Sequence, residues 1–380
     1  MDPGGNGTLP SGNTGHLSTK ARFGVRKYAL HFPNGRRAHP GMSIRTLIET
    51  VDRKAGSPLA RTARRTRHAS GVAAIEEGMR WVDFEVDRRM RRRRYANSYS
   101  DEIVDAEALA SLRADGVTVL RGAADRTMLS ALRSELEIEL DSGAHLTRVA
   151  NDAVRAPGDR SEARVFLLPA DLEQGQAAFR DRTNFGAVAD LFVRCPMAIR
   201  FALDERYLAL AGAYLGCPPA IGGGNLRKSF LNDLPDFDTL FFHSDRNSPC
   251  FLKFFFYLHD VDEGHGPFAY VRGSHRQKFK GWRSKYRWSH DEIAAVYGAD
   301  SILLMTAQMG DVVVADTTGF HRGTKVTSGD RSMLTVDYAV HQEFAGRSPA
   351  PRAAPDDLKN MSEPQIRALD FLDLCSSNDR

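Results

Sequence analysis

A histidine and an aspartate stand two residues apart in the segment Leu240-Phe241-Phe242-His243-Ser244-Asp245. If this segment ends a strand, the two side chains point to the same side, because strand side chains alternate with a period of two. A second histidine, His321, follows Asp245 by 76 residues, after a β-like run. Two histidines and one carboxylate leave open positions on an octahedral ion, as in non-haem Fe(II) oxygenases. The pattern predicts an iron site made by His243, Asp245 and His321, which would be the catalytic residues.

Arg331 follows His321 by ten residues, at the start of the strand-like run Ser332–Tyr338. A guanidinium can hold a carboxylate through two parallel hydrogen bonds. In an oxygenase that uses 2-oxoglutarate and O₂, this carboxylate is the distal one of the cosubstrate, and the 2-oxo acid end chelates the iron. An isolated H-x-D is weak evidence, but its combination with a later histidine and this arginine is much more specific.

The elements that must position these residues are mostly short strands. From Ala220 to Val340, β-like runs dominate and are separated by Gly, Pro, Asp and Asn. Before this region, the pattern predicts a helix, a strand and two further helices, over residues 105–114, 117–120, 125–140 and 203–215. A short helix is expected in the tail at 363–372.

The charge of the chain is divided unevenly along its length. Residues 1–100 contain 20 Lys and Arg against 8 Asp and Glu, whereas the remaining 280 residues contain 32 against 40. A basic run suggests nucleic acid or an anionic membrane surface. No recognition helix, zinc finger or aromatic RNA-binding stretch stands beside it. The alternatives are a solvated helix face, or an arm that lies across the acidic remainder of the chain.

The composition divides the chain into four segments. We expect a disordered arm (1–22), a basic, partly helical N-terminal extension (23–100), a catalytic domain (101–347) and a tail with a short helix (348–380). No run of about 18 apolar residues exists, so a membrane-spanning helix is excluded. Four widely spaced cysteines indicate neither a disulfide framework nor a zinc site, and we expect a cytoplasmic location. The sequence predicts no oligomeric state.

The segment Asp260–His275, which contains Gly266-Pro267 and Gly273-Ser274-His275, resembles the D-x-x-x-x-x-G-P…V-P-G-S-H segment of the phytanoyl-CoA dioxygenase family. The H-x-D at His243 and the G-D…H-x-G…R pattern that ends at Arg331 match further motifs of that family. Leu109–Gly122 is similar to its entry helix and first strand. The resemblance covers roughly residues 105–345. Arg272 departs from it, because the family usually has Pro at this position of the turn.

The resemblance implies a mainly β fold with flanking helices, built on a double-stranded β-helix (jelly-roll, cupin-like) core. It implies Fe(II) held by His243, Asp245 and His321, and 2-oxoglutarate anchored by Arg331. Phe255 would face the cosubstrate, and by alternation Lys253 and Tyr257 point the same way. A buried lysine must be paired, so Lys253 contacts 2-oxoglutarate or a substrate carboxylate, or else pairs with a structural Asp.

The implied reaction is hydroxylation of an unactivated C–H bond, with release of succinate and CO₂. Asp245 favours hydroxylation over halogenation, since related halogenases usually have a small residue there. Desaturation or ring formation stays open.

The substrate would be a small or carrier-linked metabolite. The segment Arg276–Trp288 has six basic residues and four aromatic ones, so an anionic substrate could contact Arg276, with Arg227, Lys228 and Tyr257 as further candidates. The alternative is a solvated loop whose aromatic rings pack on the barrel. Two other functions are weighed for the whole protein: a nucleic-acid-associated protein that binds through residues 23–95, and a non-catalytic β-barrel binding protein.

Overall fold

The computed structural model describes residues 81–82, 84–93, 104–142, 176, 180–181, 183–188, 190–246, 248–340, 348–351 and 360–375. All of them belong to one compact unit that begins at Ala74. The expected disordered arm and most of the basic extension lie outside the described residues. None of the helices in the described part of the chain has the length and apolar character that crossing a bilayer requires.

Six antiparallel strands form the larger of two facing sheets. Their order is β1 (Val117–Leu120), β7 (Val312–Ala315), β4 (Phe251–Tyr257), β9 (Arg331–Ala339), β3 (Ala220–Ser229) and β2 (Phe185–Ala187). The facing sheet has the order β6 (Ile302–Met305), β5 (Phe268–Val271) and β8 (His321–Gly323). A separate parallel pair joins β10 (Ser348–Pro351) to β11 (Leu372–Cys375). The mainly β class with a jelly-roll core is confirmed.

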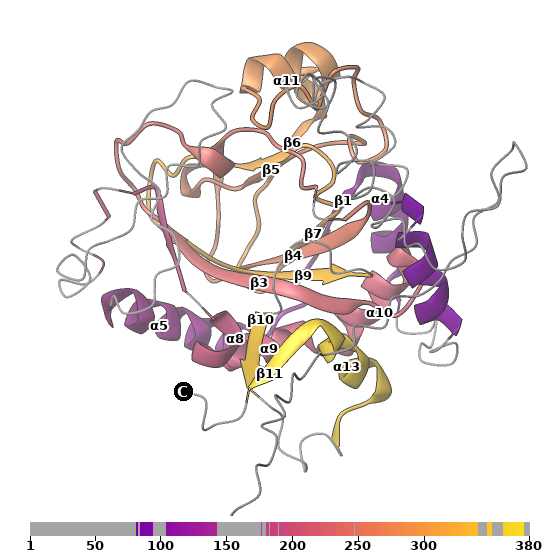
Figure 1. The fold of residues 1–380 in the computed structure, drawn as a ribbon. Helices are drawn as coiled ribbons and strands as arrows, with labels where there is room; N and C mark the ends of the chain where they lie inside the picture. Colours follow the sequence, from indigo (N-terminus) through magenta and orange to yellow (C-terminus); the bar gives the residue numbers. More distant parts are fainter. Residues whose placement is uncertain are drawn as a thin grey trace, which may run out of the picture. The chain divides into compact units, whose positions relative to one another are not determined.

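Helices cover the outer face of the larger sheet, and a further helix lies beyond the smaller sheet (Figure 1). The α-helices are α4 (Ala106–Asp115), α5 (Arg126–Ser142), α8 (Leu191–Arg194), α9 (Met197–Ala202), α10 (Glu205–Leu215), α11 (His290–Tyr297) and α13 (Glu363–Ala368). The 3-10 helices are η2 (Asp238–Leu240), η3 (Glu263–His265), η4 (Ala299–Ser301) and η5 (Leu369–Phe371). The flanking helices are therefore distributed over both sheets, with most of them on the larger one.

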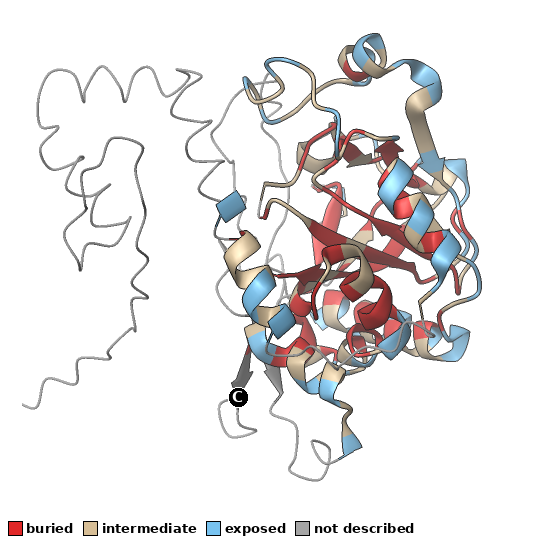
Figure 2. Cartoon of the chain, turned by 90° about the vertical axis from the view of Figure 1, so that its right-hand side faces the viewer, coloured by how far each residue is buried: buried red, intermediate tan, exposed pale blue. Residues whose placement is uncertain are grey.

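The burial of β4 explains its unbroken aromatic run. Phe254 and Phe256 point to the helical side, where their rings lie 5.5 and 5.4 Å from that of Tyr207. Phe255 and Tyr257 belong to the cluster between the two sheets. Both faces of the strand are therefore buried, so that polar–apolar alternation is lost. Figure 2 shows buried residues concentrated in the sheets, while the outer faces of the helices are exposed.

The predicted helices before the β-rich region are confirmed. Residues 105–114, 125–140 and 203–215 correspond to α4, α5 and α10, and the strand 117–120 is β1. The apolar face of α5 is fully buried, at Leu129, Leu132, Leu136 and Leu140. Spacing at three and four residues predicts such a face well, because it depends only on the helical period.

The strand that we expected to end at the H-x-D is not formed. This segment contains η2, after which Phe242 and His243 make single bridges to Trp288 and His321. Both partners are far away in the sequence, so local alternation does not reveal them. The tail helix also ends earlier than the predicted 363–372, because Leu369–Phe371 forms η5 and Leu372 begins β11.

The described part of the basic extension contacts the domain. Residues 84–93 are helical, and Phe84 is buried against Leu215, Cys217 and Val340. The guanidinium of Arg91 donates hydrogen bonds to the carbonyl oxygens of Pro218, Pro219 and Arg367 and pairs with Asp370 at 3.2 Å. Arg92 and Arg93 are exposed.

Candidate active site

His243, Asp245 and His321 lie together, with one possible ligand atom from each within 4.8 Å of the others. The Nε2 atoms of His243 and His321 are 3.8 and 3.6 Å from the Asp245 carboxylate oxygens. Bonds of about 2 Å to one shared ion place donor atoms roughly 3–4 Å apart. The three residues therefore fit a metal ion, and two nitrogens with one oxygen suit iron.

Backbone hydrogen bonds set the two histidines side by side. The backbone N–H of His243 donates to the carbonyl of His321, and the reverse bond is also formed, each at 2.9 Å. The backbone N–H of Asp245 donates to the Thr317 carbonyl at 2.9 Å, and the Ser244 hydroxyl to that of Thr318 at 2.6 Å. The H-x-D segment is thus fastened along its length to the segment that leads into β8.

Both imidazoles are oriented by their own chain. Nδ1 of His243 lies 3.0 Å from the Phe241 carbonyl oxygen, and Nδ1 of His321 lies 3.0 Å from that of Gly319. An Nδ1–H that donates to these acceptors leaves the lone pair on Nε2, which is the atom that faces Asp245. Such an arrangement prepares both rings for metal ligation.

The protonation states suit the same role. Burial lowers the pKa of both imidazoles, that of His321 to about 3, so both rings are neutral near pH 7. Burial alone would raise the pKa of Asp245, but the ammonium of Lys253 and the two imidazoles hold it well below its usual range. Neutral nitrogens and an ionised carboxylate are the forms that bind a cation.

Lys253 on β4 pairs with the candidate carboxylate ligand itself. Its Nζ lies 3.0 Å from Oδ2 of Asp245 and 3.8 Å from Oδ2 of Asp337 on β9. The register of β4 and β9 places Lys253 directly opposite Asp337. Burial beside Asp245 raises the pKa of Asp337 to about 6, in spite of the lysine. Lys253 therefore pairs with carboxylates of the chain, and its contact with 2-oxoglutarate or a substrate carboxylate stays a prediction.

Arg331 is almost completely buried, with 1% of its surface exposed, at the start of β9. Its Nη2 donates to the Ser229 hydroxyl at 3.1 Å, whereas its Nε and Nη1 have no hydrogen-bond partner in the part of the chain that the structure describes. A buried guanidinium with unused N–H groups is costly unless an anion completes it. The group fits one end of a dicarboxylate, which supports the expected role toward 2-oxoglutarate.

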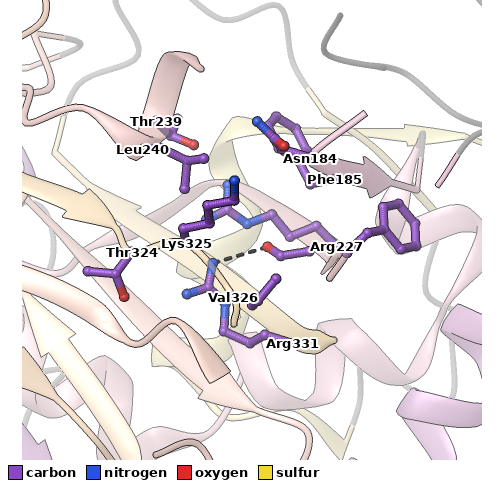
Figure 3. Close-up of a pocket in the computed structure, with 11 residues that line it drawn as sticks. Asn184, Phe185, Arg227, Thr239, Leu240, Thr324, Lys325, Val326 and Arg331 are labelled. Atoms are coloured by element: carbon purple, nitrogen blue, oxygen red, sulfur yellow. Dashed lines mark hydrogen bonds between the residues drawn. The ribbon is translucent and has the colours of Figure 1, made fainter. Parts of the chain in front are cut away.

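Arg331 lines a small, partly open cleft (Figure 3). Arg227 on β3 and Lys325 reach into the same cleft, so that three cationic side chains converge there. The lining residues are Asn184, Phe185, Arg227, Ser229, Phe230, Thr239, Leu240, Thr324, Lys325, Val326 and Arg331. None of them is acidic.

The other predicted site residues lie in different settings. Phe255 packs on Phe268, whose ring in turn lies 5.5 Å from that of His321, so Phe255 belongs to the wall beside the candidate iron site. The Tyr257 hydroxyl already donates to the Met305 carbonyl and accepts from the Phe268 N–H. Arg276 is exposed and contacts the Ala114 carbonyl at 3.5 Å, and nothing in the described residues brings it to His243 or Asp245.

The basic and aromatic segment after the Gly-Ser-His turn packs largely on the domain. Phe279, Trp282 and Trp288 join a cluster with Phe320, the residue before His321. Lys285 pairs with Glu292 and Arg287 with Asp238, both within the described chain. These contacts are those expected of a loop whose aromatic rings pack on the barrel.

Sequence reasoning missed three residues of the site: Asp337, Ser229 and Arg246. Asp337 shares a strand face with Arg331, so alternation along β9 could have revealed it. Ser229 is identified only by the register of β3 against β9. Arg246 follows Asp245 directly, and its guanidinium lies 4.9 and 4.3 Å from the ring centres of Trp282 and Tyr286.

Residues 112–333, more than half of the chain, match the family model described as Phytanoyl-CoA dioxygenase (PhyH). No curated protein matches the chain.

Several solved structures are similar. The epimerase SnoN in complex with Fe3+, alpha ketoglutarate and nogalamycin RO is 17% identical, with 61% of this chain and 82% of that chain covered and a TM-score of 0.44. HygX from Streptomyces hygroscopicus with nickel and 2-oxoglutarate bound is 17% identical, with 67% and 93% covered and a TM-score of 0.42. EctD from S. alaskensis is 18% identical, with 63% and 78% covered and a TM-score of 0.43. On the family match and the His-Asp-His site, the chain belongs to the phytanoyl-CoA dioxygenase family and is a 2-oxoglutarate-dependent non-haem iron oxygenase, with iron, 2-oxoglutarate and O₂ as its cofactor and cosubstrates.

Proposed function

We propose that this oxygenase hydroxylates an unactivated C–H bond of a small or carrier-linked metabolite and releases succinate and CO₂. His243, Asp245 and His321 would hold the iron, and Arg331 the distal carboxylate of 2-oxoglutarate. Iron bound there supplies the oxidising power, which is coupled to decarboxylation of 2-oxoglutarate. The observation that carries the proposal is the His-Asp-His group, together with a buried arginine that has unused N–H groups.

The chain's own residues would position and shield the reactants. Lys253 holds one oxygen of Asp245 at 3.0 Å, which fixes the carboxylate and leaves its other oxygen for the metal. Phe255 and Phe268, with ring centres 4.3 Å apart, form an apolar wall next to His321. Such a wall keeps water from the reacting C–H bond.

A carboxylate ligand at position 245 favours hydroxylation, because it occupies the position that related halogenases free for a halide. Desaturation and ring formation use the same ligand set, so the product decides among them. A product that gains one oxygen atom from ¹⁸O₂ supports hydroxylation, whereas loss of two hydrogens would contradict it.

An anionic group on the substrate is part of the proposal. Arg246 directly follows Asp245 and stacks between Trp282 and the exposed Tyr286, at the segment that carries several further cations. A cation held over aromatic rings next to the iron ligands suits a carboxylate or phosphate on the substrate.

We also propose a cytoplasmic location, which the free thiols of Cys195, Cys217 and Cys250 support.

The test is anaerobic addition of Fe(II) and 2-oxoglutarate, read by the visible metal-to-ligand charge-transfer band. We expect His243→Ala, Asp245→Ala and His321→Ala each to abolish the band. His265→Ala is the matched control, because this histidine pairs with the exposed Asp262 and should leave the band intact. A band that persists in all three site variants would contradict the assignment of His243, Asp245 and His321 as iron ligands.

The two other functions raised by the sequence gain no support. In residues 84–93, the part of the basic run that the structure describes, Arg91 is used within the chain's own domain. A non-catalytic binding protein would have no use for a complete ligand set together with Arg331.

A further inference from the structure

Arg227 lies in the same cleft as Arg331 (Figure 3), and the proposed reaction assigns it no role. It belongs to β3, two residues before Ser229, and Ser229 is the strand partner of Arg331. Alternation along β3 therefore puts Arg227 and Ser229 on one face. The cleft thus receives two guanidinium groups from neighbouring strands.

Arg227 is half-buried and also has an unused N–H group. Its buried Nε has no hydrogen-bond partner among the described residues, and its guanidinium lies 5.4 Å from the ring centre of Phe185. The pKa of Arg227 is lowered to about 10, mainly by burial and to a smaller extent by the positive charge of Arg331. The third cation, Lys325, already donates to the Leu234 carbonyl at 2.6 Å.

No acidic residue is among the described residues that line the cleft, so the like charges of the buried Arg331 and the half-buried Arg227 are not neutralised there, which is destabilising. Nearby carboxylates are engaged elsewhere: Asp330 with Arg180 and Lys228, and Asp238 with Arg287. Buried N–H groups that lack a partner call for an explanation in a native fold. An anion between the two guanidiniums would supply the missing acceptors and the missing negative charge together.

We propose that Arg227 and Arg331 form a two-arginine clamp on the distal carboxylate of 2-oxoglutarate. The inference rests on the proposed function, since it assumes that 2-oxoglutarate enters with its 2-oxo acid end toward His243, Asp245 and His321. A carboxylate has acceptor positions for more than one guanidinium. The clamp makes the cosubstrate site selective for 2-oxo acids that carry a second carboxylate.

Selectivity is measured by comparing 2-oxoglutarate with 2-oxopentanoate, which has the same chain length and lacks the distal carboxylate. Each is titrated anaerobically into the Fe(II)-loaded protein, and the charge-transfer band reports binding without turnover. We expect Arg227→Met to raise the Kd of 2-oxoglutarate about tenfold and to change that of 2-oxopentanoate less than about twofold.

The matched control is Lys228→Met, which removes one positive charge from the adjacent residue on the same strand. Lys228 contacts Glu137 and Asp330 instead of lining the cleft, so both Kd values should stay unchanged. If Arg227→Met does not fold, Arg227→Gln keeps a polar side chain without the charge and should again weaken only 2-oxoglutarate.

A second measurement needs no iron. Glutarate is a dicarboxylate without the 2-oxo group, and it should raise the melting temperature of the metal-free parent protein. The same concentration should raise the melting temperature of the metal-free Arg227→Met variant by a smaller amount. The metal-free variant should itself melt no lower than the parent, because one of two neighbouring like charges has been removed.

The outcomes separate the clamp from the function on which it rests. If the parent protein gives no band with 2-oxoglutarate, the proposed function fails. If the parent gives the band and Arg227→Met weakens both 2-oxo acids equally, or neither, the clamp is overturned and the proposed function stands.

Discussion

The imidazole rings of His243 and His321 are oriented in the same way, although the two residues are far apart in the sequence. In each, Nδ1 lies 3.0 Å from the carbonyl oxygen of the residue two positions earlier, so the ring orientation is fixed by the histidine's own segment. The reciprocal backbone bonds between the two residues then fix the separation of the rings. The ligand set is thus preorganised by the fold, and metal binding should need little rearrangement.

Arg331→Met should raise the 2-oxoglutarate concentration that gives half of the charge-transfer band by at least about 100-fold. The variant removes two or more charge-assisted hydrogen bonds, each worth about 1.5–3 kcal/mol. A titration of the Fe(II)-loaded protein measures the shift, and the band at saturation should keep its position because the iron ligands are unchanged. Arg331→Lys should recover part of the loss. An unchanged requirement would mean that another residue anchors the cosubstrate.

At the residue scale, spacing and family motifs were enough to predict the three ligand candidates, whose possible ligand atoms lie within 4.8 Å of one another, whereas the role of Arg331 stays a prediction. The partner of Lys253 was not predictable, because alternation gives the face of β4 but not the residue opposite. That residue is Asp337, and it depends on the register of β4 against β9, two strands that are far apart in the sequence. The lack of a described hydrogen-bond partner for the Nε of Arg227 was not predictable for the same reason.

At the element scale, the turn between β7 and β8 leads directly into the second histidine, which begins β8. Asp316 anchors this turn, since its carboxylate accepts from the N–H and hydroxyl of Thr318 and from the Tyr214 hydroxyl. The carbonyl of Asp316 accepts from the hydroxyl of the buried Tyr270. Both the carboxylate and the backbone carbonyl of Asp316 are therefore engaged in holding the turn.

Gly319→Ala should damage both stability and the iron site. A Cβ at Gly319 would overlap the Tyr270 hydroxyl and come within 3.0 Å of the Ser274 hydroxyl, and Tyr270 is fully buried and cannot move aside. We expect a loss of about 1–3 kcal/mol in the free energy of unfolding. Iron should bind more weakly, because the Gly319 carbonyl orients His321. Denaturant unfolding and Fe(II) titration measure the two effects.

Gly222→Ala is the control for this change. Its added Cβ would meet nothing closer than 3.5 Å, which is ordinary contact, so stability and iron affinity should both stay near those of the parent. Equal behaviour of the two glycine variants would contradict the positioning role of Gly319.

The elements differ in how far the sequence predicts them. The helices α4, α5 and α10 follow from capping residues and helical periodicity, which are local. The H-x-D segment was wrongly expected to end a strand, because its backbone is held by His321, Trp288 and Thr317 through nonlocal hydrogen bonds. Nonlocal pairing also determines β8, a strand of three residues whose sequence shows no β period.

At the scale of the whole molecule, the uneven charge distribution has a structural counterpart. The described end of the basic extension places Arg91 against the carbonyls that follow α10 and against the segment that contains α13 and η5. Its guanidinium also lies 5.3 Å from the ring centre of Phe371. One arginine of the run thus links the N-terminal extension, the domain and the tail.

Arg91→Met should therefore loosen the tail without changing the iron chemistry. The loss of its carbonyl partners and of Asp370 should lower the free energy of unfolding by about 1–3 kcal/mol and speed amide hydrogen exchange in residues 360–372. Arg92→Met is the matched control, because Arg92 is the exposed neighbour in the same helix. The charge-transfer band should be the same in both variants, since Arg91 contacts none of the site residues. If Arg91→Met and Arg92→Met unfold alike, the extension does not hold the tail, because the link through Arg91 is the contact that distinguishes the two positions.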